Sequence, residues 1–190
     1  MALTNLRAGA YAPGSVLECI SGPCNGSSVT VGSGTYTMPN VTGTQTLSTT
    51  YTDITGSSIS YTPPAGTKRV YYELYLTLSS IGYSGISHYK FFVDGTEATD
   101  ARRTEAYSYD GNTQGNLAVS LKWSIEVGGT ADTDTPVLSS WTTAKTLKWQ
   151  ARNYDTAYKM ELHRNHWWDG AGASGGDLWA APVLTITAFA

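Results

Sequence analysis

The chain has 190 residues, which is long enough for one domain with a sizeable core and short for two. Only 14% of the residues are charged and the formal net charge is −3, which argues against a nucleic-acid binder, because phosphate contacts need clustered Lys and Arg. The one basic pair, Arg102-Arg103, is interpreted as a solvated strand end. Hydrophobic residues at 41% provide enough apolar surface for a folded chain, and the abundance of Gly, Ser and Thr favours strands and turns over helices.

The first ten residues contain no apolar run of the length found in a signal peptide. No stretch anywhere approaches the 18 apolar residues of a membrane-spanning helix. We therefore expect neither a secretory leader nor membrane insertion.

Residues 1–45 carry Gly, Pro, Ser and Asn every few positions and have only short apolar runs. This pattern predicts an irregular N-terminal arm with one or two short hairpins. Cys19 and Cys24 are separated by the turn-forming spacer Ile-Ser-Gly-Pro, so two interpretations stay open. The turn brings them within reach of a disulfide, or they are two free thiols.

From residue 46 the pattern becomes regular. Strands are expected over 46–54 and 57–62, followed by a stop at Pro63-Pro64 and a long strand over 68–78. Alternation places the apolar residues of the long strand on its inner face, and Tyr71 and Tyr75 on its outer face. These two tyrosines are candidate oligomer-interface residues, because Tyr buries much area at a low entropic cost.

Two further segments have clear strand patterns. Residues 88–93 lead into Asp94-Gly95, a strong signal for a tight hairpin. Residues 116–127 alternate without a miss between apolar and polar side chains, and residues 128–136 form a long polar loop.

The last quarter of the chain predicts three strands and one aromatic loop. The strands are expected over 147–154, 158–164 and 182–190. The loop provides a candidate site for a ligand or the host surface, since aromatic ring faces beside planar hydrogen-bonding groups are the chemistry of sugar binding: Asn165, His166, Trp167, Trp168 and Asp169. The alternative is that one Trp plugs the end of the sandwich.

Seven or eight such strands without βαβ alternation predict an all-β fold, an antiparallel two-sheet sandwich of the jelly-roll type. We place this domain at residues 46–190, with the arm at 1–45 as a docking segment. Sheet edges of low charge favour self-association, which would cover them.

The sequence contains few residue patterns that are typical of a catalytic or metal-binding site. There is no G-x-S-x-G motif, and the fifteen acidic residues show no recurring pair of the kind that a glycosidase requires. His163 and His166 lack a ligand set of characteristic spacing, and Asp132 and Asp134 lack the rest of a calcium loop. We expect no catalytic residues, no metal and no cofactor, and therefore no enzyme.

Several segments resemble the virion structural proteins of tailed bacteriophages, in particular fibre, spike or head-decoration modules whose β domains form trimers. The resemblance lies in residues 12–18, 33–41 and 48–64, the Phe91–Glu97 hairpin, and the ending that contains His163, Trp168-Asp-Gly170 and Pro182-Val-Leu-Thr-Ile. It implies a virion protein made in the host cytoplasm and exposed on the particle exterior. It carries no catalytic residues with it.

Three functions compete at this point. The first is a structural protein of the virion surface, a homotrimer that contacts other capsid or tail proteins through its N-terminal arm. The second is a carbohydrate-binding module or the receptor-binding tip of a fibre, which would bind a host-surface glycan through Trp167 and Trp168. The third, a polysaccharide depolymerase, ranks last.

Overall fold

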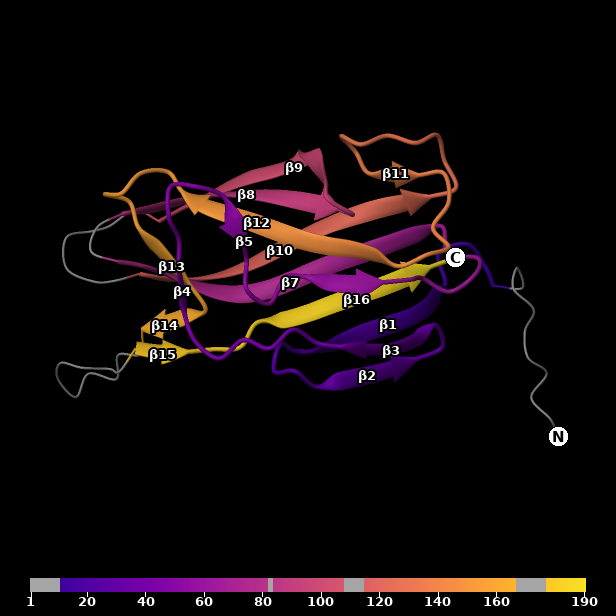
Figure 1. Cartoon of the computed structure of the whole chain (residues 1–190), viewed down its shortest axis with the longest axis horizontal. Helices are drawn as coiled ribbons and strands as arrows, with labels where there is room; N and C mark the ends of the chain where they lie inside the picture. The colour runs from indigo at the N-terminus through magenta and orange to yellow at the C-terminus, as the bar shows by residue number, and fades with distance from the viewer. Residues whose placement is uncertain (1–10, 82–83, 108–114, 167–176) are drawn as a thin grey trace.

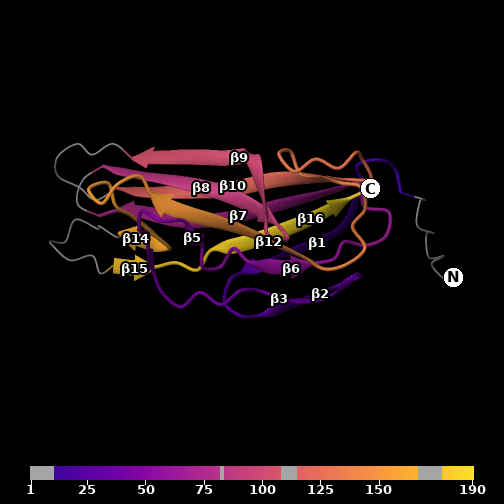
Figure 2. The ribbon, with the colours of Figure 1, turned by 45° about the horizontal axis from the view of Figure 1, so that its top comes forward.

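The computed structural model describes residues 11–81, 84–107, 115–166 and 177–190. Within these ranges there is no helix, and two β-sheets pack face to face (Figures 1 and 2). The prediction of an all-β sandwich is confirmed.

The first sheet has seven strands along the path β1-β16-β7-β10-β11, with β13 pairing to β7 and β4 pairing to β13. Their bounds are β1 (Val16–Pro23), β4 (Gln45–Thr46), β7 (Arg69–Ser80), β10 (Asn116–Val127), β11 (Val137–Leu138), β13 (Met160–Leu162) and β16 (Val183–Phe189). All pairs are antiparallel except the short pair β10–β11, which is parallel.

The second sheet has five strands along the path β5-β12-β8-β9, with β6 also pairing to β12. Its strands are β5 (Thr52–Asp53), β6 (Ile59–Tyr61), β8 (Gly85–Val93), β9 (Thr96–Tyr107) and β12 (Lys145–Asn153). Two hairpins lie outside these sheets: β2 (Ser28–Val31) with β3 (Gly34–Thr37), and β14 (Arg164–His166) with β15 (Asp177–Trp179).

The strand order is that of a jelly roll. In chain order the eight principal strands are β1, β6, β7, β8, β9, β10, β12 and β16. In one sheet β1, β16, β7 and β10 lie side by side, which are the first, eighth, third and sixth of these strands. In the other sheet β6, β12, β8 and β9 lie side by side, which are the second, seventh, fourth and fifth. This arrangement is two interleaved Greek keys, the order expected for a jelly roll.

Alternating side chains build the core between the sheets. Tyr72, Leu74, Leu121 and Ile186 of the first sheet are fully buried, as is Trp149 of the second. The rings of Phe91 and Trp149 lie 5.1 Å apart and those of Tyr72 and Phe91 5.4 Å apart, so aromatic contacts join the two layers.

The Asp94-Gly95 hairpin forms as predicted between β8 and β9. Both residues have positive φ, 51° and 84°, as a two-residue type I′ turn requires. The strands predicted over 46–54 and 57–62 are much shorter in the structure, where only β4, β5 and β6 form.

Residues 16–45 are not an arm in the structure. β1 pairs with β16 over its whole length, from Val16 opposite Phe189 to Pro23 opposite Val183, and so forms an edge of the first sheet. Ile20 and Met38 belong to the core. The boundary predicted at residue 45 therefore cuts through the sandwich, whereas the expected short hairpin is present as β2–β3.

The C-terminus and the first described residues lie at one end of the sandwich. Gly14 N donates to Ala190 O at 2.7 Å, and Ala190 N donates to Ser15 O at 2.9 Å. The start of β8 and the ends of β9 and β12 lie at the opposite end (Figure 1). We call this opposite end the distal end.

Candidate functional site

The outer face of the first sheet contains both predicted interface tyrosines. Because Tyr72 and Leu74 point into the core, the alternation of β7 turns Tyr71 and Tyr75 outward. Tyr75 is 47% exposed and Tyr71 is half-buried. Their outward orientation agrees with the sequence-based expectation.

The neighbours of these tyrosines are mostly uncharged. Tyr75 lies opposite Ser120 of β10 on one side and Val183 of β16 on the other. Farther along the same face, Ser21 and Thr185 share a hydrogen bond of 2.8 Å between their hydroxyls. We call the outward side chains of β1, β16, β7 and β10 the tyrosine face.

The charges on the tyrosine face are arranged in opposite pairs. Glu73 lies across from Lys122, and Arg69 across from Glu126. Glu73 also accepts a hydrogen bond from the Ser120 hydroxyl, and Arg69 lies 4.9 Å from the centre of the Phe189 ring. The face is thus rich in hydroxyl and aromatic groups and electrostatically balanced.

The outer face of the second sheet is different, because it is dominated by ion pairs. Lys90 and Arg102 both bind Glu97, at 3.0 and 2.6 Å, and Lys148 binds Asp53 at 2.9 Å. The hydrogen bond from Arg102 is the main reason that the pKa of Glu97 is lowered. Burial alone would raise the pKa of Asp53, but hydrogen bonds from Lys148 and Gln150 outweigh it and the pKa is lowered.

Cation–π contacts add to this charged surface, two of them on Tyr51. The Lys90 ammonium lies 4.6 Å from the centre of the Tyr51 ring, and the Arg152 guanidinium lies 5.3 Å from the same ring. The charged side chains of this surface favour exposure to solvent over burial in an interface. Of the two outer faces, the tyrosine face is therefore the better candidate for contact with another protein.

The predicted aromatic loop is only partly described. Asn165 and His166 belong to β14, while Trp167, Trp168 and Asp169 lie outside the described residues. On the returning strand β15, Trp179 is 46% exposed.

Cys19 and Cys24 are free thiols rather than a disulfide. They are separated by five positions on and after an extended strand, a separation of roughly 16 Å that a disulfide cannot bridge. Cys19 is exposed, whereas Cys24 is buried and donates from Sγ to Gly56 O at 3.3 Å. The intervening residues extend instead of turning, because β16 supplies their hydrogen-bond partners.

His163, which the sequence places in the expected strand 158–164, is fully buried. It interrupts the expected strand 158–164 with a φ of 62°, separating β13 from β14. Neither ring nitrogen has a partner in hydrogen-bond geometry among the described residues. Burial lowers the pKa of His163 to about 4, and the nearby main chain of Thr55 offsets this only in part.

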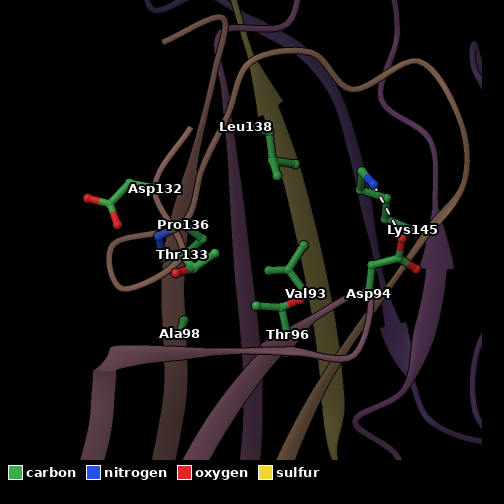
Figure 3. Close-up of a pocket in the computed structure, with 9 residues that line it drawn as sticks. All are labelled: Val93, Asp94, Thr96, Ala98, Asp132, Thr133, Pro136, Leu138 and Lys145. Carbon is green, nitrogen blue, oxygen red and sulfur yellow. Dashed lines mark hydrogen bonds and ion pairs between the residues drawn. The ribbon is translucent and has the colours of Figure 1, made fainter. Parts of the chain in front are cut away.

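A cavity of about 180 Å³ lies at the end of the sandwich that holds the C-terminus (Figure 3). It is bounded by the β8–β9 turn and by the loop between β10 and β11. Lys145 and Asp94 form an ion pair of 3.3 Å on one side, while the Asp132 carboxylate points away from them. The charged groups do not converge, so the cavity has no arrangement for acid–base chemistry.

The described residues contain neither a metal site nor a membrane-spanning helix. No three His, Cys, Asp or Glu side chains in these ranges are close enough together to hold a metal ion. No helix in the same part of the chain is long and apolar enough to cross a bilayer.

Comparison with known proteins gives no family. No family model matches the chain, and no curated protein matches it significantly.

Sequence reasoning missed a shallow groove at the distal end, formed by Tyr107, Tyr154 and Tyr158 with their neighbours. The signal available in the sequence was a pair of tyrosines flanking Asp155-Thr156-Ala157, a segment that begins with turn-forming residues. The pairing of β8 with β9, which brings Tyr107 to the same place, is a tertiary feature.

Proposed function

We propose that this chain is a non-enzymatic surface protein of a tailed bacteriophage particle, a short fibre, spike or capsid decoration protein. It assembles as a homotrimer through the tyrosine face and is exposed on the exterior of the virion. The observation that carries the proposal is the contrast between the two outer faces. The tyrosine face is rich in hydroxyl groups and its charges are balanced, whereas the outer face of the second sheet is covered with ion pairs. The sequence resemblance to virion proteins supplies the biological setting.

The tyrosine face supplies part of the area that a trimer interface buries. Two strands of about 40 Å and two of about 25 Å, spaced by about 4.8 Å, present roughly 600 Å² of flat area, to which side-chain relief adds. A standard interface needs about 800 Å² per partner. Around a three-fold axis each subunit contacts two neighbours through two different parts of this face, and the contacts close into a ring. Side chains beyond the flat strands therefore have to contribute to the buried area.

The experiment is a measurement of mass by light scattering at micromolar concentration. We expect three times the monomer mass of 20.3 kDa for the parent protein. Tyr75→Glu, which buries a charge in the interface, is expected to give the monomer. Tyr154→Glu is the matched control: it changes an exposed tyrosine outside the tyrosine face and is expected to remain trimeric.

A monomeric parent protein would contradict the assembly proposal. A dimer that Tyr75→Glu dissociates would keep the interface and overturn the trimer. Electron microscopy of phage particles with an antibody against this chain tests virion membership separately, and absence of label from intact particles would refute it.

A second function is supported by the exposed aromatic side chains near the distal end, Trp179, Tyr154 and Tyr158. In this alternative the distal end is a carbohydrate-binding surface that contacts a host glycan, with Trp167 and Trp168 among its contact residues. Replacement of Trp168 by Ala is expected to weaken binding to host cells without lowering the melting temperature.

A further inference from the structure

A shallow groove opens on the second sheet at the distal end. It is lined by Ser84, Ile86, Ala106, Tyr107, Tyr154 and Tyr158. Tyr154 is 56% exposed and Tyr158 is 38% exposed. The two rings have their centres 6.2 Å apart and meet at 56°, so they form two walls of a corner rather than a flat stack.

The segment that carries both tyrosines is held in place by its own hydrogen bonds. The Asp155 carboxylate accepts from Ala157 N at 2.9 Å, and Tyr158 N donates to Asp155 O at 3.3 Å. The main chain of β8 fixes the segment from below, since Tyr154 N donates to Ile86 O at 2.9 Å and Ile86 N donates to Tyr158 O at 3.3 Å. The corner is therefore preorganised, which reduces the entropic cost of binding.

The other two sides of the groove are also fixed. Tyr107 packs on Gly115 so closely that a Cβ there would lie 1.7 Å from the tyrosine ring. The His88 ring packs beneath Tyr154, with ring centres 5.9 Å apart, and its Nδ1 pairs with the Thr104 hydroxyl at 2.8 Å.

The chemistry of the lining restricts the ligand. None of the described lining residues is charged, so they provide no ion-pair partner for an acidic or basic ligand. Tyr154 and Tyr158 are exposed, and among the described residues no hydrogen bond involves their hydroxyls, so these are available to a ligand as donors or acceptors. The two main-chain groups of Ile86 are already used by Tyr154 and Tyr158, so β8 offers no free hydrogen-bonding groups to an extended peptide at this position. The edge of the sheet here is β9, and a peptide bound along it is one of the outcomes that the test distinguishes. Ring faces with hydroxyl groups at their rim fit a neutral sugar, which has apolar C–H faces and a rim of hydroxyls.

We infer that this groove is a binding site for a neutral saccharide, in which Tyr154 and Tyr158 form the stacking walls. The inference rests on the second function above, in which the distal end binds carbohydrate. It assigns that binding to Tyr154 and Tyr158, in the segment after β12, instead of to Trp167 and Trp168. The site lies outside the tyrosine face, so each subunit of a trimer would carry one.

The test is saturation-transfer NMR and titration of the full chain with the methyl glycosides of glucose, galactose, mannose and N-acetylglucosamine. We expect at least one of these to bind, with saturation transferred to its ring protons from tyrosine. Tyr154→Ala is expected to weaken this binding by about fivefold to tenfold. Tyr154→Phe, which keeps the ring and removes the hydroxyl, is expected to retain more of the affinity than Tyr154→Ala.

The controls separate this site from others. Tyr11→Ala removes a tyrosine that is 42% exposed outside the groove and should leave the affinity unchanged. If a glycoside binds and Trp168→Ala abolishes binding while Tyr154→Ala does not, the groove assignment is overturned and carbohydrate binding stands. If none of the four glycosides binds, or if an oligoproline peptide binds in the groove instead, the groove assignment and the carbohydrate-binding function are both overturned. Thermal melts of the variants confirm that they fold.

Discussion

At the residue scale, His163 ties stability to pH. The unfolded chain takes up a proton near pH 6.5, whereas the folded protein does so only near pH 4. Stability from the neutral imidazole is therefore fully present above pH 6.5 and is lost as the pH falls toward 4, with no further loss below. The size of this contribution is roughly 3 kcal/mol.

The variant that tests this is His163→Asn, since Asn tolerates the left-handed backbone at φ 62°. Urea unfolding at pH 7 and at pH 4 should show that the parent loses more stability between the two values than the variant does. Equal losses in both proteins would show that another group causes the pH dependence.

The two cysteines give a second residue-scale prediction. Burial raises the pKa of Cys24 to about 12, so it carries almost no thiolate at neutral pH, and its side chain is also enclosed. Iodoacetamide is expected to modify Cys19 in the native protein and to modify Cys24 only after unfolding, as peptide mass spectrometry can measure. A reducing agent should leave the melting temperature unchanged. A fall in melting temperature would instead indicate a disulfide.

At the scale of elements, β1 decides how the N-terminal part of the chain behaves. The domain boundary expected from the sequence at residue 45 implies that a chain without residues 1–45 would still fold. The structure leads to the opposite expectation, because the deletion removes the partner of β16 and the side chain of Glu18, which accepts from the buried Tyr61 hydroxyl at 2.7 Å. An unpaired buried hydroxyl alone costs about 1–3 kcal/mol.

We therefore expect the chain of residues 46–190 to be insoluble or to lack a cooperative thermal transition by circular dichroism. Glu18→Gln is the milder comparison, since its amide oxygen still accepts from Tyr61, and it should fold with a lowered melting temperature. A cooperative transition in the truncated chain would restore the original boundary at residue 45.

At the scale of the whole molecule, the tyrosine face predicts how assembly responds to salt. The charges on this face lie in pairs of opposite sign within a subunit, such as Glu73 across from Lys122. Few charges therefore remain for contact between subunits. Raising the salt concentration from 0.05 to 0.5 M shortens the Debye length about threefold, yet association should weaken little. Sedimentation velocity measures this, and a strong loss of trimer in salt would point to the ion-paired face of the second sheet as the interface.

The sequence by itself determined the strand pattern and its polarity. Alternation in residues 68–78, 116–127 and 147–151 was enough to predict the core face, because a side-chain period of two has one consistent inward set. The Asp94-Gly95 turn was equally readable, since few residues tolerate positive φ at both positions.

Only the tertiary structure decided which segments become neighbours. β1 looked irregular because an edge strand needs little hydrophobic pattern of its own, and its place in the sheet comes from β16, more than 150 residues away in sequence. The same holds for His163, whose burial depends on elements packed around it and not on strand parity. The groove lined by Tyr107, Tyr154 and Tyr158 could also be found only from the fold. The pairing of β8 with β9 and the turn after β12 bring these side chains together from distant parts of the chain.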